Sequence, residues 1–99
     1  MKYVIEYSPE TEEHFRVLTA REQRIVLDGV ERQLRYQPDV ETHHRKPMRP
    51  NPLAPWELRV GNLRVYYEIE YDPEPAVWIA AVGKKEGNCV IIGKEVVVL

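Results

Sequence analysis

Two arginines stand at mirrored positions around a Gly-Asn pair in the stretch WELRVGNLRVYYEIE, residues 56–70. Gly61-Asn62 is typical of a two-residue hairpin turn, because glycine accepts the positive φ that such turns need. A turn of this length places Arg59 directly opposite Arg64. Planar guanidinium groups with two parallel donors are well suited to holding a phosphate or a carboxylate, so the pair could form an anion site.

Like charges opposite each other on a sheet cost roughly 0.2–1 kcal/mol. Two arrangements could offset that cost. In the first, Glu57 and Glu68 lie on the same face and neutralise the arginines, as on many solvated sheet faces. In the second, an external anion such as a phosphate lies between the guanidinium groups. The sequence leaves both arrangements open.

The alternation of apolar and polar residues over Trp56–Val60 and Leu63–Ile69 predicts two half-buried strands. The apolar set, which includes Leu58 and Val65, is expected on one face. The other face is expected to carry Glu57, Arg59, Arg64, Tyr66 and Glu68. An outward Tyr66 beside Arg64 could stack on a nucleobase, or could be an ordinary exposed sheet tyrosine.

The formal charge of the 99 residues is −2, but it is unevenly distributed. Residues 43–64 carry five Lys or Arg and one Glu, whereas the segments on either side are acidic. A local basic patch of this kind can bind a polyanion even when the whole chain is acidic. Adjacent His43 and His44 could act as a base or ligand, but they have no second pair at a zinc spacing, so no metal is expected.

Length and composition bound the class of protein. Residues 1–99 are enough for one domain with a hydrophobic core, and the only cysteine, Cys89, cannot form an internal disulfide. A reducing compartment is therefore expected, with Cys89 as a packing residue. The N-terminus lacks the apolar run of a signal peptide, and no segment reaches the length of a membrane span. We expect a cytoplasmic protein without a membrane partner.

The elements that would position the arginines can be outlined from local signals. Lys2–Tyr7 reads as a strand, followed by a short helix from Pro9 to about Leu18 with Ser8 as its N-cap. A capping box at Thr19 and Glu22 predicts a second helix from Ala20 to about Tyr36.

Residues 38–55 hold five of the eight prolines and are expected to form a loop. Beyond the hairpin, Ala76–Val82 is predicted to be a central strand ending at Gly83, and Cys89–Ile92 with Glu95–Leu99 a second hairpin. The order predicts an α+β fold: an N-terminal strand, a helical hairpin on one face of a twisted antiparallel sheet, and a C-terminal β-hairpin.

The chain from about Lys2 to Lys85 resembles the RelE/ParE superfamily of toxins from bacterial type II toxin–antitoxin systems, which include plasmid stabilization modules. The resemblance rests on the strand-helix-helix opening, the RKPM loop, WELRVGNLRVYYEI and VWIAAVGKK. Its densest part is the pattern formed by Arg59, Gly61, Arg64, Val65 and Tyr67.

The resemblance implies a ribosome-dependent mRNA endoribonuclease that needs no metal or other cofactor. Carried over by position, Arg59, Arg64 and Lys85 would stabilise charge on the scissile phosphate. In this catalytic set, Tyr66 or His44 would position the base or the proton. The RNA-binding residues would be His44, Arg45, Lys46 and Lys84.

Two departures from the endonuclease pattern favour a second function class. The lysines of that branch would fall near Pro55 and Glu57, and its C-terminal tyrosine would fall near Ile91. The alternative is therefore a non-enzymatic inhibitor of DNA gyrase, or a catalytically inactive relative. Both classes imply a cognate antitoxin whose acidic or amphipathic tail covers the basic face or the helical hairpin. The ribosome and mRNA are partners only in the first class.

Overall fold

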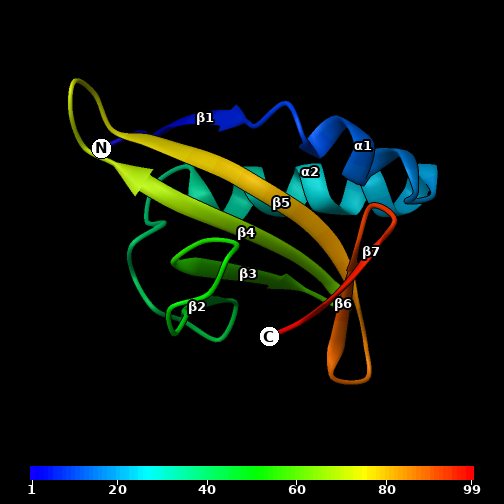
Figure 1. Ribbon diagram of the computed structural model, residues 1–99. Helices are drawn as coiled ribbons and strands as arrows, with labels where there is room; N and C mark the ends of the chain where they lie inside the picture. The colour runs from blue at the N-terminus through cyan, green and yellow to red at the C-terminus, as the bar shows by residue number, and fades with distance from the viewer.

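The computed structural model describes residues 1–99 and consists of two helices and a seven-stranded sheet (Figure 1). In chain order the elements are β1 (Val4–Tyr7), α1 (Thr11–Arg16), α2 (Ala20–Leu34), β2 (Arg45–Pro47), β3 (Trp56–Val60), β4 (Leu63–Glu70), β5 (Ala76–Glu86), β6 (Cys89–Ile92) and β7 (Glu95–Val98).

The sheet follows the order β2-β3-β4-β5-β6-β7, and all of these neighbours are antiparallel. β1 pairs in parallel with the first half of β5, from Val4 opposite Ala76 to Tyr7 opposite Ile79. β6 pairs with the far end of β5, so the N-terminal strand and the C-terminal hairpin both attach to this one long strand (Figure 1). The predicted α+β architecture, with its helical hairpin and its C-terminal β-hairpin, is confirmed.

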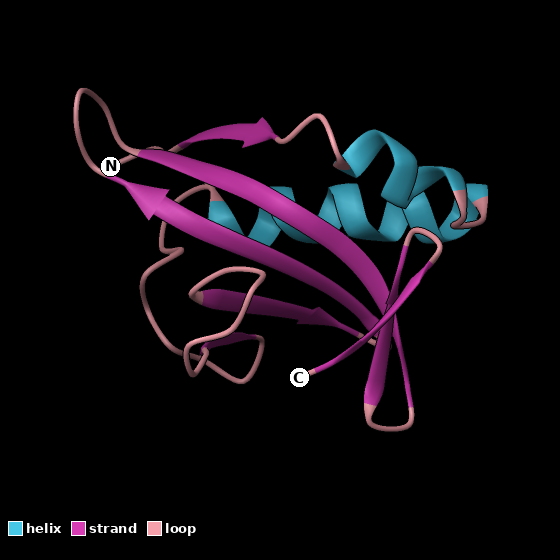
Figure 2. Ribbon diagram, in the orientation of Figure 1, coloured by secondary structure: helices cyan, strands magenta, loops and turns pink.

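Helix α2 covers one face of the sheet and begins as its capping box predicts. Thr19 Oγ1 accepts a hydrogen bond from the Glu22 N–H at 3.1 Å, and Glu22 Oε1 accepts one from the Thr19 N–H at 2.9 Å. Its fully buried residues include Val26, Val30 and Leu34. Figure 2 shows α2 running behind β4 and β5. Neither helix combines the length with the hydropathy that a membrane-spanning helix requires.

The predicted start of the first helix is wrong by two residues. Helix α1 begins at Thr11, and Ser8 does not cap it, because the Ser8 hydroxyl donates a hydrogen bond to the Ala80 carbonyl of β5 at 3.1 Å. The Thr11 hydroxyl in turn donates to the Ser8 carbonyl at 2.6 Å. The residues just before α1 therefore attach the chain to the sheet and do not extend the helix.

One additional strand and one strand boundary also differ from the prediction. The proline-rich segment contains β2, whose three residues pair with β3 from Arg45 opposite Leu58 to Pro47 opposite Trp56. β5 does not end at Gly83 but continues to Glu86. A Cβ atom at Gly83 would lie 2.7 Å from the Ile91 carbonyl oxygen, so glycine there allows β6 to approach β5 closely.

The two faces of the sheet hold separate hydrophobic clusters. The larger cluster lies under α2, and Leu58, Val65 and Tyr67 are fully buried in it, as the alternation predicts. The smaller cluster lies on the opposite face, where the C-terminal hairpin and the loop before β3 cover the sheet. Its buried members are Ala54, Tyr66, Ala81, Val90 and Ile92.

Candidate functional site

Arg59 and Arg64 lie opposite each other in the β3–β4 ladder, as the turn length predicts. Gly61 provides the required positive φ of 60° at the first turn position. A positive φ at that position alone is typical of a type II′ turn, whose twist matches that of the flanking strands.

The carboxylate of Glu57 lies among the polar groups of this face, and its side chain is only 9% exposed. Glu57 Oε1 lies 2.7 Å from Arg59 Nε, and Oε2 accepts a hydrogen bond from the Tyr66 hydroxyl at 3.0 Å. Arg64 Nε lies 4.0 Å from the same Oε2 atom. Glu57 thus neutralises the pair as in the first of the two arrangements, whereas Glu68 is exposed and forms no ion pair.

The two arginines have different surroundings. The Arg64 side chain is 11% exposed, and its Nη1 donates to the carbonyls of Gly61 at 2.7 Å and Leu63 at 3.0 Å. The Arg59 side chain is 48% exposed, and its guanidinium forms one hydrogen bond within the protein, from Nε to Glu57. Arg64 therefore stabilises the turn and the carboxylate, whereas Arg59 has free donors for a ligand.

A cavity of about 340 Å³ brings three of the predicted cations together. It is lined by Glu57, Arg59, Arg64, Lys85, Gly87, Asn88, Val90 and Leu99. Lys85 comes from the end of β5, where its Nζ donates to the Gly87 carbonyl at 2.6 Å. The continuation of β5 beyond Gly83 is what carries Lys85 to this position.

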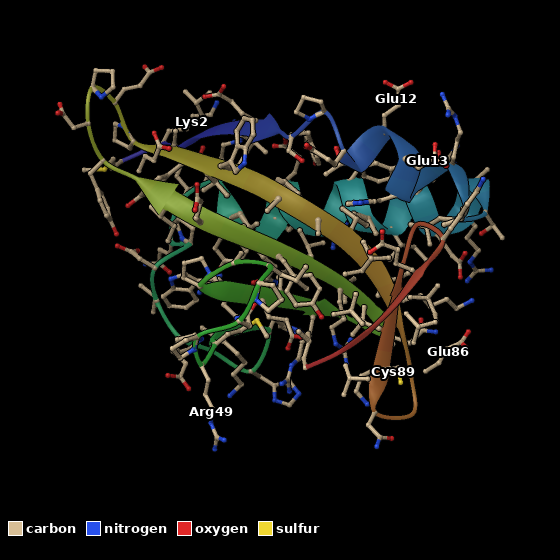
Figure 3. All side chains as sticks on the ribbon, viewed as in Figure 1. Lys2, Glu12, Glu13, Arg49, Glu86 and Cys89 are labelled. Carbon is tan, nitrogen blue, oxygen red and sulfur yellow. The ribbon has the colours of Figure 1, made fainter.

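A neighbouring cavity of about 470 Å³ extends the basic surface toward the loop before β3. Lys46 lines it from β2, directly opposite Glu57 in the ladder, and its Nζ lies 3.7 Å from the Glu41 carboxylate. Arg49 lines it as well and points away from the molecule (Figure 3). Together, Lys46, Arg49, Arg59, Arg64 and Lys85 form what we call the cationic surface.

Arg49 and Glu57 were absent from the predicted site. The charge distribution contained a signal for Arg49, since it belongs to the basic segment 43–64. For Glu57, the only sequence signal was its predicted position on the same sheet face as the two arginines. Its burial depends on the covering hairpin, which local sequence does not reveal.

Tyr66 does not lie where the sequence analysis expected it. It is on the polar face of the sheet but fully buried under the smaller hydrophobic cluster, so it cannot stack on a nucleobase. Burial raises the pKa of the Tyr66 phenol well above its usual range, and the adjacent Glu57 carboxylate raises it further. The phenol remains protonated and serves as a donor to Glu57.

Two predicted RNA-binding residues lie away from the cationic surface. Arg45 is buried, and its guanidinium donates to the carbonyls of Val40 at 2.8 Å and Gln33 at 2.9 Å. Lys84 faces α2, where its Nζ lies 2.8 Å from Glu22 Oε2. Arg45 therefore attaches the loop to the end of α2, and Lys84 attaches β5 to its start.

His44 is exposed at the end of β3, with its Nδ1 3.2 Å from the Arg59 carbonyl oxygen. It lines neither of the two cavities, and its ring lies against that of His43 at a centroid distance of 5.4 Å. No three side chains among the His, Cys, Asp and Glu residues form a group that could hold a metal ion.

The geometry combines exposed cations with one largely buried carboxylate, Glu57. Arg59 and Lys85 offer exposed donors to the smaller cavity, and Lys46 and Arg49 extend the positive potential along a polyanion. Glu57 is the only acidic side chain lining the smaller cavity, and a carboxylate has lone pairs beyond the two hydrogen bonds that it accepts here. The arrangement can therefore bind a phosphate and accept a proton beside it.

Comparison with known proteins identifies the fold. No protein-family model matches the sequence, and no curated protein matches it. Among solved structures, the chain superposes with a TM-score of 0.72 on a chain of the toxin–antitoxin complex RelBE2 from Mycobacterium tuberculosis. The two chains are 21% identical, and the match covers 86% of this chain and 100% of that one. The chain therefore has a RelE-type fold, as the pattern around Arg59 and Arg64 predicts.

Proposed function

We propose that the protein is the toxin of a type II toxin–antitoxin module and that it inhibits translation by cleaving mRNA on the ribosome. The observation that carries this proposal is the cavity that Arg59, Arg64 and Lys85 line together with Glu57. The shared fold with a chain of the RelBE2 toxin–antitoxin complex supports the same assignment.

In this proposal, Arg59 and Lys85 bind the scissile phosphate and stabilise the charge that develops on its oxygens. Glu57 accepts the proton of the attacking 2′-hydroxyl, a bond forms from the 2′-oxygen to phosphorus, and the bond to the 5′-oxygen breaks. Lys85 donates the proton that the leaving 5′-oxygen requires. Arg64 and Tyr66 keep the Glu57 carboxylate in place and contact no substrate.

The remaining cations extend the contact along the RNA backbone. Lys46 and Arg49 line the adjoining cavity, on the side of Arg59 away from Lys85. A ribosome-bound messenger would meet this surface in the cytoplasm, and a cognate antitoxin would neutralise it between rounds of activity.

The test is induction of the protein in a bacterial host without its antitoxin. Growth arrest is expected, with primer extension showing new mRNA 5′ ends within translated codons. Arg59→Ala should lose those ends while Lys84→Ala, whose side chain faces the helix, should keep them. Arrest with intact mRNA, or the same cuts from Arg59→Ala, would contradict the proposal.

A second function is favoured by one specific observation. Arg64 and Tyr66 are both used internally, which leaves fewer groups for chemistry than the sequence had indicated. A cationic surface of this kind also suits the binding of carboxylates on a protein target, as in an inhibitor of DNA gyrase. Growth arrest with unbroken mRNA and altered DNA supercoiling would select this second function.

A further inference from the structure

The outer edge of β7 has no partner in the structure, because β7 pairs only with β6 at the end of the sheet. The β6–β7 turn has two residues, Gly93 and Lys94, so Ile92 and Glu95 form the first hydrogen-bonded pair and Val90 and Val97 the next. Val96 and Val98 therefore direct their backbone N–H and C=O groups away from β6.

The composition of β7 makes this edge unusually open. Proteins generally protect edge strands with proline, charge or very short length. β2, at the opposite end of the sheet, is three residues long and ends with Pro47. β7 instead contains three consecutive valines, of which Val96 is 64% and Val98 72% exposed.

Two cavities lie beside β7, each between the C-terminal segment and the loop of residues 46–53. One, of about 510 Å³, is lined by Glu95 and Val97 on one side and by Pro52 and Leu53 on the other. The second, of about 470 Å³, is lined by Leu99 and by the residues 46–51. Glu95, Val97 and Leu99 alternate along the strand, so one face of the β7 segment forms a wall along its length.

The charge along these two cavities changes from one end of β7 to the other. The cavity beside the start of β7 is lined by the carboxylates of Glu10, Glu13 and Glu95, together with His14 and Lys94. Its centre is apolar, with Leu53, Ala80, Ile92 and Val97. The cavity beside the end of β7 is lined by the cations Lys46, Arg49 and Arg59, and Glu57 is its one acidic side chain.

We propose that an extended segment of a protein partner adds to β7 as an additional antiparallel strand. An antiparallel segment runs from the Arg59 end toward the Glu13 end. The lining of the two cavities therefore favours a partner segment with an acidic residue at its N-terminal end and a basic residue at its C-terminal end. Alternating β-branched residues between them suit the apolar centre. The proposal rests on the proposed function only in assigning this segment to the antitoxin. Main-chain hydrogen bonds supply the affinity, and the terminal charges supply the direction.

Regulation follows from the position of the segment. Its acidic residue would contact Arg59, the exposed arginine of the cationic surface, and would compete there with RNA phosphate. Occupation of the β7 edge would thus block the site without unfolding any element of the toxin.

The probe is the synthetic peptide acetyl-Glu-Val-Thr-Val-Thr-Val-Lys-amide, added to the isotope-labelled full chain. At saturation, hydrogen exchange of the Val96 and Val98 amides should slow by about tenfold or more, since both gain acceptors. The peptide with its terminal Glu and Lys interchanged should bind at least about fivefold more weakly. Equal binding of the two peptides, or no binding of either at millimolar concentration, would overturn the proposal.

Two variants test the main-chain contact directly. Val96→Pro removes an N–H that points away from β6, so the β6–β7 ladder should persist while peptide binding falls by about tenfold or more. Val96→Thr keeps that N–H and should bind within about twofold of the wild type. Val98→Pro provides a second position should the first proline perturb the hairpin. Peptide binding that survives both prolines would overturn the proposal.

A second copy of the chain is the competing occupant. Slow exchange of the Val96 and Val98 amides in peptide-free protein, lost on dilution, would assign the edge to self-association and overturn the proposal. These readouts need no toxicity, so growth arrest without peptide binding refutes strand addition alone. Peptide binding without arrest refutes only the proposed function.

Discussion

Lys84 and Lys85 are adjacent in the sequence and have opposite surroundings on the two faces of the sheet. Lys84 faces α2, and its hydrogen bond with Glu22 raises the pKa of Lys84 and lowers that of the Glu22 carboxyl. Lys85 is exposed in the cavity that contains Arg59 and Arg64. Since successive strand residues point to opposite faces, one register step separates a lysine that packs against α2 from a lysine that lines the cavity.

The same contrast distinguishes the arginines across the molecule. Arg45 is buried against the end of α2 and Arg64 against its own turn, whereas Arg59 is half exposed beside Glu57. The basic segment 43–64 thus contributes both buried structural cations and a half-exposed cation that is available to a ligand. Substitutions that separate stability from activity provide the means to test this division.

The largest effect on stability is expected on the helix-covered face. Leu58→Ala removes a fully buried side chain under α2 and should lower the free energy of unfolding by about 2–5 kcal/mol. The neighbouring Arg59→Ala should change it by about 1 kcal/mol or less, because Arg59 forms only a half-exposed ion pair. Urea denaturation of both variants makes the comparison, and similar losses would contradict the face assignment.

Arg64→Ala should lower the free energy of unfolding by about 1–3 kcal/mol, more than Arg59→Ala does. The substitution removes donors to the Gly61 and Leu63 carbonyls and a cation near the buried Glu57 carboxylate. Thermal melting beside RNA binding separates the roles. Unchanged melting with lost binding would place Arg64 among the groups that contact the ligand.

The two lysines supply a matched pair for activity. Lys85→Ala should weaken RNA cleavage or binding by about tenfold, the loss expected for one charge-assisted hydrogen bond to a phosphate. Lys84→Ala should leave activity within about twofold, because its partner is Glu22 on the other face. A primer-extension time course measures cleavage by both variants. A larger loss in Lys84→Ala than in Lys85→Ala would contradict the assignment of the two lysines to their faces.

The smallest effect concerns pH. Burial lowers the pKa of His14, whose Nδ1 accepts a hydrogen bond from the Val82 N–H at 3.3 Å, while Glu10, Glu95 and Glu13 oppose the shift. A lowered folded pKa means that the unfolded chain binds the proton more readily. Stability should therefore fall as pH drops below the ordinary histidine value of 6.5.

The control is His14→Gln, which cannot titrate. Denaturation curves between pH 7 and about pH 5 should show the His14-dependent part of the slope in the wild type and not in the variant. Equal slopes in the two proteins would show that α1 docks on β5 independently of the His14 protonation state.

The β3–β4 hairpin shows how much of the fold can be predicted from local sequence. The period-two alternation and Gly61-Asn62 specified the register, the buried face and the opposed arginines, and the structure has all three. The capping box likewise specified the start of α2. These features depend on residues that are close in the sequence, so local sequence patterns are enough to predict them.

The site was predicted less completely, because its burial depends on distant segments. Tyr66 is buried by Ala54, Val90 and Ile92, which come from the loop before β3 and from β6. Arg45 is held by the end of α2. Gly83 resembles a strand end in sequence, but β5 continues through it, and the absence of a Cβ atom there makes room for the distant strand β6.

The central claim is that the cationic surface binds the RNA backbone, and the salt dependence of binding tests it most directly. The logarithm of the association constant for a single-stranded RNA oligonucleotide should fall linearly with the logarithm of salt concentration. Arg59→Ala should make that slope shallower by about 0.7–1, the amount that one lost phosphate contact contributes, and Lys84→Ala should not alter it. A wild-type slope near zero, or equal slopes for wild type and Arg59→Ala, would contradict the account.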